Sequence, residues 1–308
     1  MCNLCYKTFK DNANFLEINN CSNIKTIPQI DVISIKIVNC PNLVKLPLLD
    51  KLKYLTLIKC VNIEEIPLYP NVQNLEIENC INIKKIPYLP KLKHLVIKYY
   101  SAFDTISNYE TLETLKLQNS NIDTIYNLHL LNTLIVINCR SLNKIYNSNQ
   151  IENFIAQDCP SIKNIPNFPK LVELTISNCE SIKLIPNFSQ LSDLVIDNFH
   201  HLLFLPLFTK LKLLFIQNCI KNIYIPKISY NNINSIDSYY ENCEIIEFYY
   251  NDEEFIIDNI QLIKLINLIK KKYIKNKLNK LYTLYRIFPK EIPIEIIRNI
   301  LVFRTIEL

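Results

Sequence analysis

The sequence predicts an α/β repeat solenoid, in which one short structural unit is stacked on itself along the chain and a helical region follows. Three observations predict this class. An apolar pattern returns every 19 or 20 residues, cysteine occupies one fixed column of that pattern, and the spacing changes after residue 251. The stretch LEIENCINIKKIPYLPKLKHLVI, residues 75–97, shows one unit and the start of the next. Self-similarity at such a short period is typical of solenoids.

Composition sets the first limits on function. The chain has 308 residues, of which 49% are hydrophobic, enough to bury a core. Its 34 basic and 29 acidic residues give a net charge of +5, too small to predict a nucleic-acid-binding protein. No apolar run reaches the length of a signal peptide or a membrane span. We therefore expect a soluble cytoplasmic protein whose eleven cysteines stay reduced.

Motifs for catalysis and for cofactor binding are missing from the sequence. The chain has four His and no Gly, so Gly-rich phosphate loops cannot occur, and no HExxH or Ser-His-Asp pattern is present. We expect no enzymatic activity, no cofactor and no metal site.

Residues 1–12 are expected to cap the first repeat. They contain a CxxC pair, Cys2 and Cys5, which is half of a zinc-knuckle or redox motif. No second half follows at a matching spacing, so the cap is the favoured interpretation and the metal or redox pair is the alternative.

Residues 13–229 hold eleven repeats, aligned on one column. Apolar residues recur eight, five and three positions before this column and three and six positions after it, and proline commonly follows at position plus seven. The column residues are Cys21, Cys40, Cys60, Cys80, Tyr100, Ser120, Cys139, Cys159, Cys179, Phe199 and Cys219.

Each part of the unit has a structural expectation. Alternation at minus five and minus three predicts a short strand with one buried face. Twenty residues leave too little chain for a helix, and the prolines favour irregular, 3₁₀ or polyproline backbone on the return side. Asn at minus one, as in Asn39 and Asn79, is expected to take the left-handed conformation that Gly usually supplies.

The unit LxxLxIxNCxxIxxIP resembles the leucine-rich repeat over about residues 13–226. The 20-residue period and the IPxLP ending are similar to the shortest class, seen in bacterial effectors, and the cysteine column resembles repeats encoded by giant viruses. The resemblance implies a horseshoe with a parallel sheet on its concave face, and, for a viral protein, the host-cell cytoplasm.

The cysteine column could serve a metal array, a row of disulfides or packing. In-register cysteines would repeat about every 4.8 Å with parallel Cβ vectors, which suits neither a disulfide nor a tetrahedral zinc site. A ligand column would also not accept Phe199. We therefore expect buried thiols that pack as small apolar groups and donate weak hydrogen bonds to loop carbonyls.

Recognition is expected at the outward strand positions, which are minus six, minus four and minus two. Ile135, Ile137 and Ile155 form an apolar group at mid-solenoid, although β-branched residues also simply suit strands. His94 is expected to be a surface polar residue rather than a ligand. The candidate protein-binding residues are Tyr54, His94, Lys116, Ile135, Ile137, Ile155 and Phe215.

The last part of the chain departs from the repeat. Residues 230–251, including Cys243, are expected to be a degenerate repeat or connector, and residues 252–308 a basic helical region. Asp252 or Asp258 would cap its first helix, and one face would be rich in lysine. That helix would cap the solenoid, or bind anionic membrane or a nuclear import factor.

The segment IPIEIIRNIL, residues 292–301, resembles the first helix of an F-box. Only seven residues follow Leu301, too few for the remaining F-box helices. The sequence thus favours a non-enzymatic scaffold that binds a protein or peptide on its concave face. The alternative is an adaptor that recognises substrates for a cullin-type ubiquitin ligase. The residues that would contact the ligase are Ile292, Pro293, Ile296, Ile297, Ile300 and Leu301.

Overall fold

The computed structural model describes residues 14–100, 104–200, 202, 205, 206 and 208–219, and the backbone of four further strands up to residue 256. Statements about the fold concern this part of the chain. The predicted cap over 1–12, with Cys2 and Cys5, lies outside it, as do Cys243 and most of 252–308.

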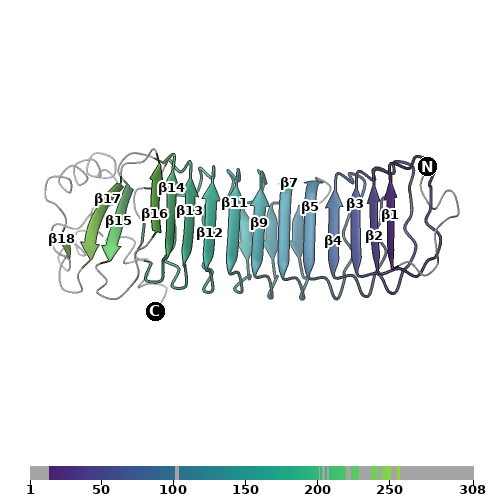
Figure 1. Cartoon of the computed structure of the whole chain (residues 1–308), viewed down its shortest axis with the longest axis horizontal. Helices are drawn as coiled ribbons and strands as arrows, with labels where there is room; N and C mark the ends of the chain where they lie inside the picture. The colour runs from purple at the N-terminus through teal and green to yellow at the C-terminus, as the bar shows by residue number, and fades with distance from the viewer. Residues whose placement is uncertain are drawn as a thin grey trace, which may run out of the picture.

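One twelve-stranded sheet runs along the molecule, with each strand hydrogen-bonded to its neighbour in the next repeat. The strands lie side by side in a single row along the long axis (Figure 1). Equivalent residues of successive repeats are in register, as in Ile77 beside Ile97. The chain is therefore a parallel-stranded solenoid with turns of about 20 residues, as the sequence predicted. Its strands are β1 (Phe15–Asn19), β2 (Ser34–Val38), β3 (Tyr54–Ile58), β4 (Asn74–Glu78), β5 (His94–Tyr100), β7 (Thr114–Ser120), β9 (Thr133–Ile137), β11 (Asn153–Gln157), β12 (Glu173–Ser177), β13 (Asp193–Asp197), β14 (Leu213–Gln217) and β16 (Asp237–Glu241).

A second, three-stranded parallel sheet lies on the return side of the middle repeats. It contains β6 (Thr105–Ser107), β8 (Thr124–Tyr126) and β10 (Lys144–Tyr146) in the order β10-β8-β6. These strands belong to the three repeats that lack proline at position plus seven. Proline has no N–H to donate to a ladder, and the first two proline-bearing repeats make a single bridge, Thr26 to Lys45.

The C-terminal strands extend beyond the predicted repeats. β16 falls within the segment 230–251 and pairs with β14, adding the twelfth strand. A third sheet contains β15 (Ile223–Ile228), β17 (Ile245–Tyr250) and β18 (Phe255–Ile256).

A two-residue strand lies near the start of the segment 252–308, for which a basic helical region is predicted. Residues 255–256 form β18, antiparallel to β17. Pairing with the neighbouring strand satisfies backbone groups there that a helix would otherwise satisfy internally. The described residues contain no helix, so the α part of the predicted class and the helical cap stay predictions.

The core is a set of apolar columns that run the length of the solenoid. Strands alternate partly exposed and buried residues, and the apolar positions at minus eight, minus five, minus three, zero, plus three and plus six are buried in nearly every repeat. The column at position zero takes Tyr100, Ser120 and Phe199 as well as cysteine, and these three are at most 2% exposed. Among the described residues no helix is long and apolar enough to cross a membrane.

Turns without glycine rely on left-handed residues at or immediately after the ends of the strands. Residues at minus one have φ near +52°, and most of them are Asn, as predicted. Side-chain ladders support them: Asn39 Nδ2 donates to Asn20 Oδ1 at 2.8 Å. Lys59 (φ 54°) and Tyr99 (φ 53°) occupy the same column, although Lys and Tyr adopt the left-handed conformation less readily than Asn.

Candidate protein-binding surface

The cysteine column is a packing column in the described repeats. All eight of its cysteines there are buried, and none of them forms a disulfide. The Sγ atoms of the column cysteines from Cys40 onward donate to the carbonyl two residues earlier, as from Cys159 to Gln157 O at 3.2 Å. Several also lie within hydrogen-bonding distance of a carbonyl in the preceding strand, as Cys179 does to Ala156 O at 3.5 Å. No group of three His, Cys, Asp or Glu side chains in the described residues could hold a metal ion. The structure confirms the packing interpretation.

Burial and neighbouring thiols change the acidity of this column. The hydrogen bond with Cys139 lowers the pKa of Cys159, but the bond with Cys179 and burial outweigh it and raise that pKa to about 12. The pKa of Cys60 is raised by its contact with the Cys80 thiol and by burial. The hydrogen bond with Cys60 lowers the pKa of Cys80, and the bond with Cys159 lowers the pKa of Cys179, so the two thiols of each pair shift in opposite directions.

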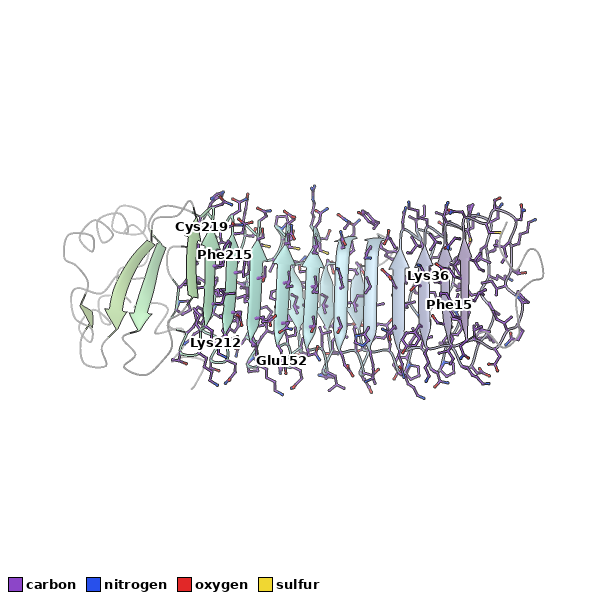
Figure 2. All side chains as sticks on the ribbon, in the orientation of Figure 1. Phe15, Lys36, Glu152, Lys212, Phe215 and Cys219 are labelled. Atoms are coloured by element: carbon purple, nitrogen blue, oxygen red, sulfur yellow. The ribbon has the colours of Figure 1, made fainter. Side chains whose placement is uncertain are left out.

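The solvent-facing surface of the twelve-stranded sheet carries every residue that the sequence put forward for binding. The first, third and fifth residues of each strand from β1 to β14 in this sheet face outward, and their neighbours in the next strand are the equivalent residues. Figure 2 shows side chains along this face, from Phe15 and Lys36 at one end to Phe215 at the other. Three parallel lines of outward side chains result, one residue per repeat.

The N-terminal half of this surface is charged and internally paired. Lys36 Nζ lies 3.1 Å from Glu17 Oε1 in the neighbouring strand. Lys98 Nζ lies 2.7 Å from Glu76 Oε1 and 3.4 Å from Glu78 Oε2. The hydrogen bond with Glu76 is the main cause that raises the pKa of Lys98. Charges here largely satisfy one another.

The C-terminal half of the middle line is apolar except at Thr175. Lys116 pairs with Ile135, which pairs with Ile155, and the line continues across β12 to β14. These side chains are partly exposed. We call them the central stripe: Ile135, Ile155, Thr175, Val195 and Phe215.

Acidic side chains accompany the stripe. Glu173 and Asp193 are register neighbours in the outward line on one side, and Asp197 lies in the line on the other side. Asp197 accepts hydrogen bonds from Ser177 Oγ and Asn218 Nδ2, both at 3.0 Å. Among the described residues no Lys, Arg or His nitrogen lies within 4.0 Å of these three carboxylates.

The predicted residues do not form one cluster. Lys116, Ile135 and Ile155 are successive neighbours in the middle line, and Phe215 is the last stripe residue of the same line. Ile137 lies in an outer line between Gln118 and Gln157. Tyr54, 44% exposed, and His94 belong to the N-terminal half, two strands apart.

Sequence reasoning missed two features. Thr175 and Val195 are not among the residues that the sequence put forward for binding, yet they make the stripe continuous. On the return side Leu48, Leu68 and Tyr88 are 61%, 66% and 55% exposed, one position after successive prolines. The signal in the sequence was the apolar residue at position plus eight in three adjacent repeats.

Comparison with protein-family models, with curated proteins and with solved structures finds no match to this chain. The architecture itself defines a class, a solenoid of parallel strands with turns of about 20 residues.

Proposed function

We propose that this chain is a non-enzymatic interaction protein that binds a protein or peptide partner on the solvent-facing surface of its long sheet. The observation that carries the proposal is the central stripe, because four apolar side chains and Thr175 aligned across five strands leave a continuous surface that gains from being covered. The sheet also places this surface on a rigid, in-register scaffold.

We propose further that the unit is a short leucine-rich repeat and that the sheet surface is concave, as in that family. The support is the pattern LxxLxIxNCxxIxxIP together with a parallel strand at each LxxLxI segment. The further proposals of a viral origin and of a location in the host-cell cytoplasm rest on the resemblance of the cysteine column to virus-encoded repeats.

The test compares two triple variants in affinity purification from cell lysate. Ile135→Asp, Ile137→Asp and Ile155→Asp together put carboxylates on the sheet surface. Capture of partners is expected to fall to background, because ionised groups in the contact would have to be desolvated. The matched control, Leu48→Asp, Leu68→Asp and Tyr88→Asp, changes three apolar residues on the return side and should keep capture.

Thermal unfolding checks that both variants are folded. Unchanged capture by the sheet variant, or equal loss in both variants, would contradict the proposed surface.

A further inference from the structure

The charges on the sheet surface are unequally divided between its two halves. The outward positions of β9, β11, β12, β13 and β14 include no basic residue and three acidic ones, Glu173, Asp193 and Asp197. Basic side chains lie at the two ends of this group of strands, Lys116 on the neighbouring strand β7 and Lys212 immediately before β14. The half that carries the central stripe is therefore acidic, whereas the other half neutralises its acids with Lys36 and Lys98.

Two of these carboxylates are direct neighbours. Glu173 pairs in register with Asp193 across β12 and β13. Like charges opposite each other in a sheet repel, and no cation of the described residues lies within 4.0 Å to offset that repulsion. A partner that places cations beside this pair would relieve the repulsion while it covers the stripe.

Spacing along the stripe favours one kind of secondary structure in the partner. Neighbouring strands lie about 4.8 Å apart, so the five stripe residues extend over about 19 Å. A helix lying along the stripe presents an apolar residue about every 5.4 Å, whereas an extended peptide does so about every 6.7 Å. The acidic residues lie two positions along the strand from the stripe, about 6.6 Å, which is close to the radius of a helix with its side chains.

We infer that the stripe binds a basic amphipathic helix of another protein, with apolar residues at helical spacing on the stripe and Lys or Arg on its flanks beside Glu173, Asp193 and Asp197. This inference rests on the proposed function of the sheet surface and adds the chemistry of the partner. Helix-in-groove recognition uses the same anchors three and four residues apart.

The experiment uses the full chain and a fluorescein-labelled synthetic peptide of about 18 residues, with Leu at helical spacing and Lys on both flanks. Fluorescence anisotropy gives its Kd. The expected result is saturable binding that weakens about tenfold or more in the variant Glu173→Lys with Asp193→Lys, because attraction becomes repulsion. Raising the salt from about 0.05 to about 0.5 M should weaken binding to the wild type and have less effect on that variant.

Matched controls separate binding at Glu173 and Asp193 from unspecific electrostatic attraction of the peptide to the protein. Glu64→Lys with Glu65→Lys makes the same charge change at two exposed residues outside the sheet surface and should leave the Kd unchanged. The milder pair Glu173→Gln with Asp193→Asn removes the charges with little change in shape and should weaken binding by a smaller factor. This milder variant tests the inference if the charge-reversal variant fails to fold.

Several results would overturn the inference. These are absence of binding to the wild type, equal binding of a peptide with Glu in place of Lys, and equal loss in the Glu64 and Glu65 variant. Residues 259–308 of this chain are themselves basic, with 11 Lys or Arg and 3 Asp or Glu. Self-association that the Glu173 and Asp193 reversal abolishes would assign the stripe to a second copy and exclude a separate partner.

The two proposals fail differently. If the Ile135, Ile137 and Ile155 variant loses partner capture but the basic peptide does not bind, the proposed function stands and the partner chemistry is wrong. If that variant keeps full capture, the sheet surface itself is wrong.

Discussion

The backbone N–H of Cys60 donates a hydrogen bond to the Sγ atom of Cys80, 3.4 Å away and one repeat further along the chain. The Cys80 thiol in turn lies 3.5 Å from the carbonyl oxygens of Leu57 and Glu78. A buried backbone donor thus finds its partner in a side chain of the next repeat, which ties adjacent turns together.

Replacing Cys80 by alanine should therefore destabilise the fold without affecting recognition. Cys80→Ala leaves a small void and removes the acceptor of the Cys60 N–H, so the free energy of unfolding should fall by about 1 to 3 kcal/mol. Urea denaturation measures this loss, and the exposed substitution Val44→Ala is the control. A loss of partner capture larger than the loss of stability would contradict a structural role for the thiol.

Stability should decline in alkaline solution because of the same column. The folded-state pKa of Cys159 is raised to about 12 and that of Cys60 is also raised, whereas an unfolded thiol titrates near 8.5. Above about pH 8.5 the unfolded chain releases protons that the folded chain retains, so each such thiol lowers stability by up to about 1.4 kcal/mol per pH unit.

Urea midpoints at pH 7.5 and about 9.5 measure this effect. The variant Cys159→Ala should show a smaller difference between the two midpoints than the wild type. If the difference between the two midpoints is the same in the wild type and in Cys159→Ala, Cys159 does not contribute to the loss of stability. Native thiols should also react with an alkylating reagent at the rate of unfolding.

Two turn residues offer stabilising substitutions. Lys59 and Tyr99 have φ values of 54° and 53°, a conformation that Asn adopts at lower cost. Lys59→Asn and Tyr99→Asn should each raise the free energy of unfolding by up to about 1 kcal/mol. Asn at position 59 would also stand between Asn39 and Asn79 and could extend the amide ladder.

Thermal unfolding tests these substitutions. Lys53→Asn makes the same chemical change where the backbone is not left-handed and should give no gain. A gain of the same size at Lys53 would show that conformation is not the cause.

The F-box-like segment gives the last prediction, which concerns residues outside the described part. Ile297→Asp with Leu301→Asp should lower the thermal stability if the segment caps the solenoid, because the buried face of a cap is apolar. If the segment docks on a ubiquitin ligase, the same pair should abolish co-purification with cullin and leave stability unchanged. A wild-type protein that never co-purifies with a cullin excludes the adaptor.

The strands and their buried faces could be predicted because their causes are local. Alternation at minus five and minus three, as in Leu75 and Ile77, identifies the inward face, and the 20-residue period fixes which residues are equivalent. The left-handed turn at Asn79 followed from the absence of glycine. The burial of Cys80 could be predicted because a straight column of cysteines has the wrong geometry for a metal site or a disulfide, which leaves packing in the core.

Other features depend on which repeats are neighbours. The second sheet over β6, β8 and β10 forms where three adjacent repeats lack proline at position plus seven, so that every residue there has an N–H to donate to a ladder. The absence of proline from these three repeats is visible in the sequence. The expectation of an irregular return side covers every repeat, and it is wrong for these three. Residues 255–256 likewise became a strand through pairing with β17.

The sequence by itself determined the solenoid, its period, its core columns and its outward lines, because each follows from the spacing of side chains within one unit. The tertiary structure decided what those lines become when repeats stack. Ile135 and Phe215 are 80 residues apart in the chain. Parallel register places them on one apolar stripe, with Glu173 beside Asp193 at its flank. Each strand contributes one residue to this surface, so the surface forms only once backbone hydrogen bonds have set the register between the strands.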